Sequence, residues 1–368
     1  MSSSSQKRIR RMTRKVKVGN ITIGGDEPIV VQGMANVPTH DIDRCVAQIN
    51  AMVEQGCELV RLAVPGKKDT QALPEILNQV QVPVVADVHF HYRRALEAIE
   101  ARVNKIRLNP GNIKDRKQVE EVIAACKSNQ VAIRVGVNEG SIRQRHNEPV
   151  RRQEQGGDLI DLMTAKLQEY VRIFEDNNFA DLVLSGKCHD AWRCVELNRA
   201  LSERFDYPLH IGVTHAGDVQ SGSVRSATAL GALLSEGIGD TIRVSLAGDP
   251  LTEIEVAWEI LDSLNLRRRE RARLIACPTC GRTQIDVIGM VEQVKQALVD
   301  IKTPVKVAVM GCVVNGPGEA EEADVALCGG KEKAMIYRGG RKVATVNAEK
   351  AVEVLLEQVK IFINEQKN

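Results

Sequence analysis

The sequence predicts an α/β protein with a (β/α)8 TIM-like barrel followed by a small α+β domain. The chain has 368 residues, more than one hydrophobic core usually supports, whereas a barrel takes about 250 residues. Short apolar, β-branched segments alternate with amphipathic segments along most of the chain. A charge run, "RRRERARL", then interrupts this pattern. We therefore expect a barrel over residues 16–265 that binds the substrate and a second domain over residues 271–368.

Eight strand candidates carry the barrel prediction, and each is rich in Val, Ile or Leu. They lie at residues 29–34, 59–64, 84–89, 105–110, 132–137, 182–187, 210–215 and 241–246. Segments such as 42–55 and 116–128 have the apolar period of amphipathic helices. Eight consecutive βα units close into a parallel barrel. We expect the hairpin-like "KVKVGNITIGG", with its Gly19-Asn20 turn, to cover the barrel floor.

Composition excludes several classes of protein. A formal net charge of +2 gives no general attraction to nucleic acid, and no segment is long and apolar enough to span a bilayer. Residues 1–15 are Ser-rich and basic without an apolar core, which predicts a flexible leader, with an organellar transit peptide as the alternative. Nine cysteines, two of them in a Cys-x-x-Cys motif, indicate thiolate ligands in a reducing compartment, so we expect a cytoplasmic protein.

Polar residues follow every predicted strand. Barrel active sites form at the carboxyl ends of the strands, so these residues are the candidate site. They are Gln32, Asn36, Arg61, Asp87, His89, Arg107, Asn109, Arg134, Asn138, Ser185, Lys187, Thr214, His215, Arg243 and Ser245. Four arginines and a lysine converge although the chain is almost neutral, and arginine binds phosphate oxygens in bidentate fashion. The pattern favours a substrate with two or more phosphate charges. Ion pairing of single arginines with barrel carboxylates stays open as the alternative.

The second domain is expected to begin with a Cys-x-x-Cys loop, a helix over 286–300 and a strand over 305–310. A Gly-Pro-Gly turn follows, which allows the chain to double back. Strands near 323–328 and 333–346 and a final helix from Ala348 complete the pattern. About a hundred residues are enough for this domain to have a hydrophobic core of its own.

Three cysteines in two loops of the second domain are candidate metal ligands. Cys277 and Cys280 have the spacing that lets two thiolates reach one metal centre, and Cys312 precedes the Gly-Pro-Gly turn. A tetrahedral site needs a fourth ligand, and this domain contains no histidine. Cys328 would complete a structural zinc site, which the residues alone leave open. The remaining cysteines are expected in the core, with Cys188 near the barrel mouth.

Six motifs occur together along the chain: "ACPTCGR", "GCVVNGPGEA", "LLSEGIGDTIRVSL", "ADVHF", "RLNPGN" and "RVGVN". In combination they resemble the bacterial 4-hydroxy-3-methylbut-2-enyl diphosphate synthases, in the short two-domain form, over almost the whole chain. The resemblance implies a second domain that is similar to the nitrite/sulfite reductase fold. It also implies a [4Fe-4S] cluster held by Cys277, Cys280, Cys312 and Glu319, and Glu319 is then the fourth ligand.

The same resemblance implies an activity. The reaction is the two-electron reductive ring opening of 2-C-methyl-D-erythritol 2,4-cyclodiphosphate to 4-hydroxy-3-methylbut-2-enyl diphosphate, with reduced flavodoxin or ferredoxin as electron donor. The implied assembly is a homodimer whose active site is shared between subunits. Glu319 and His215 are the implied catalytic residues. The implied substrate contacts are Arg61, Asp87, His89, Arg107, Asn109, Arg134, Asn138, Lys187, Thr214, Arg243, Ser245 and Asn315.

Three departures from the family pattern bear on function. "GVTHAG" has His215 where members have a glutamate, "VQGMAN" lacks two hydroxyls at Gly33 and Ala35, and "LSGKCHD" adds Cys188 and His189. Imidazole donates a proton near neutral pH, so catalysis is compatible with His215. Two alternatives remain. One is a non-redox barrel enzyme that acts on a phosphorylated small molecule and has a structural zinc site, and the other is a diverged, non-catalytic paralogue.

Overall fold

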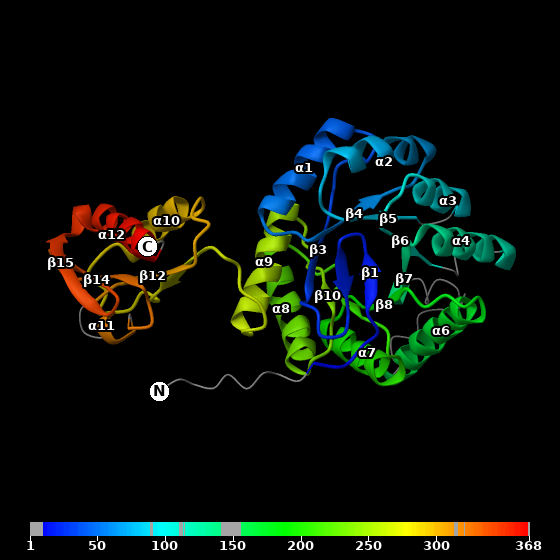
Figure 1. The fold of residues 1–368 in the computed structure, drawn as a ribbon. Helices are drawn as coiled ribbons and strands as arrows, with labels where there is room; N and C mark the ends of the chain where they lie inside the picture. Colours follow the sequence, from blue (N-terminus) through cyan, green and yellow to red (C-terminus); the bar gives the residue numbers. More distant parts are fainter. Residues whose placement is uncertain are drawn as a thin grey trace. The chain divides into compact units, whose positions relative to one another are not determined.

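The structure is a computed structural model. It describes residues 10–88, 91–109, 113, 115–140, 156–312, 316–319 and 321–366. The chain forms two compact units, Met1–Arg268 and Arg269–Asn368 (Figure 1). No helix in the described part of the chain is both long and apolar enough to cross a lipid bilayer.

The first unit is a nearly closed barrel of eight parallel strands, which confirms the predicted fold class. The strands are β3 (Val30–Met34), β4 (Leu59–Ala63), β5 (Val84–Asp87), β6 (Lys105–Leu108), β7 (Ala132–Asn138), β8 (Leu182–Lys187), β9 (His210–Ile211) and β10 (Thr241–Ile242). Their order in the sheet is β8-β7-β6-β5-β4-β3-β10-β9, and a parallel bridge between Leu184 and Leu209 joins its two ends. Only two residues of each of the last two predicted strands are regular, and the rest form loops that carry candidate site residues.

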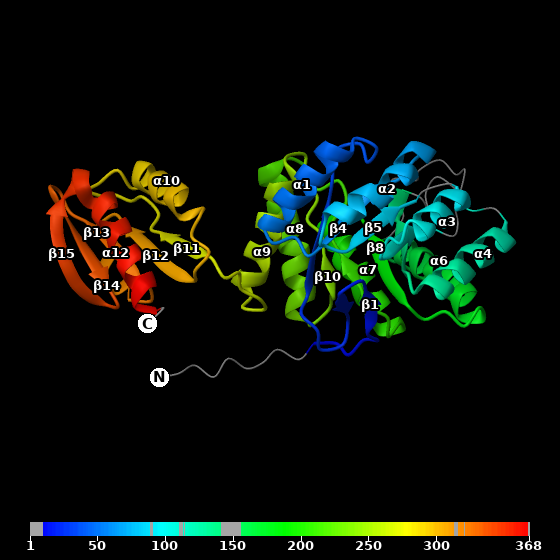
Figure 2. The ribbon, with the colours of Figure 1, turned by 45° about the horizontal axis from the view of Figure 1, so that its top comes forward.

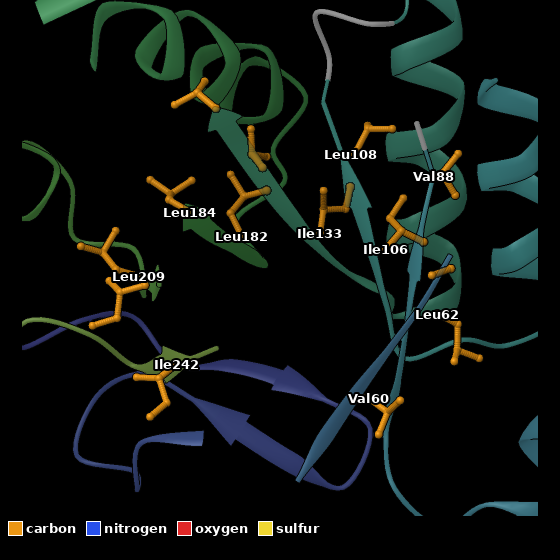
Figure 3. Close-up of a cluster of buried hydrophobic side chains, with 14 of the residues drawn as sticks. Val60, Leu62, Val88, Ile106, Leu108, Ile133, Leu182, Leu184, Leu209 and Ile242 are labelled. Atoms are coloured by element: carbon orange, nitrogen blue, oxygen red, sulfur yellow. The ribbon is translucent and has the colours of Figure 1, made fainter. Parts of the chain in front are cut away.

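Helices surround the barrel, as Figures 1 and 2 show. They are α1 (Ile42–Glu54), α2 (Lys67–Gln79), α3 (Tyr92–Glu100), α4 (Arg116–Asn129), α6 (Gly156–Asp176), α7 (Ala191–Arg204), α8 (Val219–Ser235) and α9 (Pro250–Ser263). Four of them begin at an aspartate, Asp115, Asp190, Asp218 or Asp249, whose side chain accepts a backbone N–H of the first turn. The outward strand residues pack against these helices in one large core, part of which Figure 3 shows.

An apolar layer closes the barrel floor. The predicted hairpin forms from β1 (Val16–Val18) and β2 (Ile21–Ile23), and its turn contains Gly19 with a φ of 60°, a conformation that glycine adopts without strain. The side chains that form the floor come from the hairpin and from the inward positions of five strands: Val16, Val18, Ile23, Val30, Leu59, Val85, Ala132 and Val183. The floor is therefore packed hydrocarbon, as the sequence predicted.

The end of the expected leader is bound to the floor side of the barrel. Residues 1–9 lie outside the described residues, but residues 10–15 make specific contacts. Arg10 forms a 3.0 Å ion pair with the buried carboxylate of Asp240, and the Arg11 guanidinium donates to three backbone carbonyl oxygens. Arg14 pairs with Asp206 at 2.9 Å. The leader is thus anchored from Arg10 onward.

The second unit is a five-stranded sheet with the two long helices on one face. The strands are β11 (Ala272–Ala276), β12 (Val305–Met310), β13 (Val325–Gly329), β14 (Lys333–Arg338) and β15 (Arg341–Asn347), in that order. The first three strands are parallel to one another. β14 runs antiparallel to β13, and β15 runs antiparallel to β14. The helical segments are α10 (Val287–Leu298), α11 (Gly316–Glu319), the 3₁₀ turn η2 (Ala348–Lys350) and α12 (Ala351–Gln366).

Two layers of side chains fill this second unit. Val294 of α10 and Leu355 of α12 pack with Val307 and Leu327 of the sheet. The opposite face of the sheet has a smaller cluster that includes Cys328. β11 was not predicted from the sequence, because this partly exposed strand contains Arg273 and lacks the continuous apolar pattern of the others.

Candidate active site

The barrel interior holds all five predicted cations. Successive strand residues point to opposite faces, and Figure 3 shows Ile106, Leu108 and Ile133 in the outward set. The residues between them therefore face the barrel axis. The five cations that lie there are Arg61, Arg107, Arg134, Lys187 and Arg243, and none is more than 15% exposed. Barrels usually fill this space with branched apolar side chains, so this interior is built to hold charge.

Two carboxylates neutralise part of this charge. Asp87 lies 3.6 Å from both Arg61 Nε and Arg107 Nη1. Glu253 reaches in from α9 and lies 3.3 Å from Arg243 Nη2, and it also accepts the Leu246 N–H at 2.9 Å. The ion-pair alternative therefore applies to three of the arginines. It does not apply to Arg134 and Lys187, which have no carboxylate partner among the described residues.

A sixth cation, which the sequence analysis did not select, lies in the same interior. Lys105 is fully buried at the start of β6. We call these six residues the cation cluster: Arg61, Lys105, Arg107, Arg134, Lys187 and Arg243. Within the described ranges, Arg134 Nε and Nη1 and Lys105 Nζ have no hydrogen-bond partner. Burial, followed by repulsion from neighbouring cations, holds the pKa values of Arg134, Lys105 and Lys187 well below their usual range.

The other predicted contacts surround this cluster at the strand ends. Asn109 is buried, whereas Asn138, Thr214 and Ser245 are partly exposed. His89 and Asn315 lie outside the described residues. Gly33 lacks a hydroxyl that family members have, but this does not affect the site. A Cβ at residue 33 would lie 2.3 Å from Met52 Cε, so a side chain there would point outward against α1 and away from the barrel axis.

His215 is exposed at the end of the seventh barrel strand, in a left-handed conformation with a φ of 53°. Asp218 does not orient it, because the Asp218 carboxylate accepts the N–H groups of Gln220 and Ser221 at the start of α8. In the described part of the chain, His215 makes no side-chain hydrogen bond. Its loop is tied to the preceding strand end, since the Thr214 N–H donates to the Cys188 carbonyl at 3.0 Å.

Glu139 and Arg193 form a second polar set at the mouth and were missed, whereas the third member, His189, was named only as a departure from the family pattern. Glu139 is 4% exposed and lies 2.8 Å from His189 Nδ1 and 3.4 Å from Arg193 Nη1. Glu139 directly follows Asn138, and His189 follows Lys187 by two residues, on strands that pair Asn138 with Lys187. The strand-end rule would have selected Glu139 if it had been extended by one residue. Cys188 lies at the same strand end, between Lys187 and His189, and its side chain is buried in the core.

The cysteine loops lie at adjacent strand ends in the second unit. The parallel strands β11 and β12 pair Ala276 with Val309, so the residues after them are neighbours. The Cys277 N–H donates to the Val309 carbonyl at 3.1 Å, and the Gly311 N–H donates to Cys277 Sγ at 3.1 Å. The sheet therefore brings Cys277 and the segment that leads to Cys312 to one edge.

The thiols differ in their readiness to ionise. Cys280 is exposed, and hydrogen bonds from the Arg282 backbone and side chain lower its pKa. Cys328 is buried in β13, and burial raises its pKa to about 12. Because thiolates bind metals, Cys280 is a suitable ligand and Cys328 is a poor one.

The candidate ligands of the second unit are three cysteines and Glu319. Among the described residues, no three Cys, His, Asp or Glu side chains converge in the way that one metal ion requires. Glu319 is the last residue of α11, and its side chain lies outside the described structure.

We predict that replacing Arg134 by Met stabilises the fold. The substitution exchanges an unpartnered buried guanidinium for an apolar side chain, so the free energy of unfolding is expected to rise by about 1–2 kcal/mol. Arg243→Met is the matched control, because it leaves Glu253 without its ion pair and is expected to lower this free energy by about 3 kcal/mol. Urea unfolding measures both. Destabilisation by Arg134→Met would argue against an excess of buried positive charge.

The cysteines of the metal-free protein are expected to differ in how fast they are alkylated. Iodoacetamide reacts with thiolates, so at pH 8 Cys280 should react first and Cys328 should stay unmodified while the protein is folded. Peptide mass spectrometry of timed samples measures the order, and a sample unfolded in guanidinium is the control in which Cys328 reacts as well. Rapid modification of Cys328 in the folded protein would reopen its assignment as a ligand.

The sequence profile of the GcpE TIM-barrel domain matches residues 13–258, and that of the GcpE protein C-terminal domain matches residues 273–361. A solved dihydropteroate synthase from Stenotrophomonas maltophilia aligns over 69% of this chain and 98% of its own, with 17% identity and a TM-score of 0.48.

Curated relatives match over nearly their full length. The 4-hydroxy-3-methylbut-2-en-1-yl diphosphate synthase (flavodoxin) of Lawsonia intracellularis is 46% identical over 97% of this chain and 98% of its own. The protein of the same name from Symbiobacterium thermophilum is 47% identical over 95% of this chain and 93% of its own. These matches show that the chain belongs to the GcpE family, as its motifs predicted.

Proposed function

We propose that this protein is a 4-hydroxy-3-methylbut-2-enyl diphosphate synthase. It opens the ring of 2-C-methyl-D-erythritol 2,4-cyclodiphosphate by breaking the C–O bond at C2, takes up two electrons, and releases the C3 hydroxyl as water after protonation. The observation that carries the proposal is the cation cluster, in which six basic side chains, none more than 15% exposed, face two carboxylates within the described residues. A cyclic diphosphate supplies the missing negative charge.

The chain's own residues bind and orient the substrate in this proposal. The arginines hold the diphosphate through bidentate hydrogen bonds, and Lys187 acts as a point charge beside them. Asp87 keeps Arg61 and Arg107 in place, at 3.6 Å from each. The remaining proposed contacts are His89, Asn109, Asn138, Thr214, Ser245 and Asn315. Because the diphosphate stays bound by its second ester after C2–O cleavage, the same cations hold substrate and product.

Cys277, Cys280, Cys312 and Glu319 are the proposed ligands of a [4Fe-4S] cluster. When bound, such a cluster would supply electrons one at a time. Three thiolates hold it firmly, and Glu319 is a harder oxygen donor that exchanges more readily than a thiolate. The lowered pKa of Cys280 and the sheet edge that presents Cys277 support this ligand set.

The proposed electron donor is reduced flavodoxin, which the names of the relatives include, with ferredoxin as an alternative carrier. We place the reaction in the cytoplasm, where thiol ligands stay reduced. The proposed assembly is a homodimer in which each cluster serves the partner's barrel. After α9, Arg267 binds the Ile29 carbonyl at 2.6 Å and Glu58 at 2.7 Å, on the floor side of the barrel. The chain therefore leaves the barrel opposite the mouth, which favours catalysis between subunits.

Anaerobic purification tests the proposal. The protein should be brown, contain about four irons and four sulfides per chain, and convert the cyclic diphosphate when reduced flavodoxin is present. Cys312→Ala should lose the cluster, and Cys328→Ala is the matched control that should keep it. Glu319→Ala should keep more iron than Cys312→Ala, because water can replace a carboxylate ligand. A colourless protein with one bound zinc would support the non-redox alternative, and a brown protein without turnover would support the non-catalytic paralogue.

His215 is proposed to deliver the proton that the family's glutamate delivers. His215→Gln should lower turnover about tenfold or more, in the range of one general acid, with a smaller effect on KM. His215→Glu should retain turnover, since it restores the carboxyl group. Steady-state kinetics of both variants give the answer, and full turnover in the Gln variant would exclude His215 as the proton donor.

A further inference from the structure

Lys105 is a buried amine that neither the hydrophobic core nor the proposed catalytic residues explain. It has no exposed surface, and its Nζ has no hydrogen-bond partner among the described residues. Its neighbours Ile106 and Leu108 face the outer helices (Figure 3). Lys105 pairs in register with Val85 and Ala132, both floor residues. Its side chain therefore faces the barrel axis, between the floor and Arg107.

The surroundings of Lys105 contain more positive than negative charge. Arg134 and Arg61 lower its pKa, after burial itself as the larger cause. The charged and titratable groups of the interior are Arg61 (β4), Asp87 (β5), Arg107 (β6), Arg134 (β7), Lys187 (β8), His210 (β9), Arg243 (after β10) and Glu253 (α9). His210 is fully buried, and its Nδ1 lies 2.6 Å from Thr241 Oγ1.

A charged ammonium is unfavourable in this position. An ion that is buried without hydrogen bonds loses its hydration free energy, and no protein contact replaces it. A lysine avoids this cost by losing its proton and becoming a neutral amine. The arginines cannot become neutral in this way, because guanidinium stays protonated in proteins. Lys105 is thus a group whose charge can change when the charge of the interior changes.

We propose that Lys105 is a proton-linked anion-binding residue. In the empty barrel it is a neutral amine, and it takes up one proton from solvent when a diphosphate enters the cation cluster. The bound anion supplies negative charge that favours the ammonium form. This inference rests on the diphosphate site of the proposed function. Its consequence is that binding becomes weaker as the pH rises, by at most about tenfold per pH unit for one linked proton.

Titration calorimetry with inorganic pyrophosphate tests this on the full-length protein. Measurements at one pH in two buffers of different ionisation enthalpy give the number of protons taken up on binding. Wild type should take up about one proton per chain more than Lys105→Met. Lys17→Met, the same substitution on an exposed residue of β1, is the matched control and should behave as wild type. Subtracting the proton uptake of Lys105→Met from that of wild type removes the protons that pyrophosphate itself takes up or releases on binding.

Two further measurements separate proton linkage from a merely structural role. Lys105→Arg stays charged, so it should take up no extra proton, and its affinity should fall less steeply between pH 7 and pH 9 than that of wild type. The unfolding midpoint of Lys105→Met should not fall, because an unpartnered buried amine is replaced by an apolar side chain. If Lys105→Met does not fold, Lys105→Arg provides the same contrast with wild type.

The outcomes are distinct. Equal proton uptake by wild type, Lys105→Met and Lys105→Arg would overturn this inference and leave the anion site intact. Failure of wild type to bind pyrophosphate would overturn both the anion site and the inference. Greater uptake by wild type alone, together with a steeper loss of affinity with pH, is the result expected.

Discussion

The structure depends on one electrostatic constraint, which is that a barrel interior holds more positive charge than its own carboxylates neutralise. Asp87 and Glu253 pair with three arginines, while Arg134, Lys187 and Lys105 have no carboxylate partner among the residues described. Removing such groups from water is costly. A ligand that carries several negative charges removes most of that cost. In the proposed function, the free protein therefore already carries the excess positive charge that an anionic substrate neutralises.

The rest of the barrel supplies the stability that the interior lacks. The outward strand residues and the helices form a continuous apolar core around the cations. Below them, the hairpin and the first inward residue of five strands form a second apolar layer. Arg10 and Arg11 then fasten the chain to the loops on the floor side. The charged layer lies between two kinds of hydrocarbon packing, and this low-polarity environment strengthens each interaction with an anion.

Much of this arrangement could be predicted from the sequence, because period-2 and period-3.6 patterns are local. The eight strands, the hairpin and the polar strand ends all follow from short segments. Lys105 was missed because it begins a strand, where the rule for barrel sites predicts a residue of structural importance only. Its significance depends on burial and on Arg134, both of which are properties of the folded chain.

Other omissions have the same cause. Glu253 lies on a helix and its amphipathic pattern gives no sign that it reaches Arg243. The partnership of Glu139, His189 and Arg193 joins two strand ends and a helix. In the second unit, β11 is partly exposed and contains Arg273, so its pattern resembles a loop. The cysteine spacing, by contrast, is visible directly, although only the parallel pairing of β11 with β12 explains why two distant loops meet.

The apolar floor has a consequence for the order of events in the barrel. Val16, Val18 and Ile23 close the lower end with side chains that offer no path for a charged molecule. Within the described residues, the floor end of the barrel therefore offers no route for an anion. In the proposed function, substrate and product then both pass through the end at which the strands terminate, so product must leave before new substrate binds, and other anions bound at the cation cluster compete with the substrate.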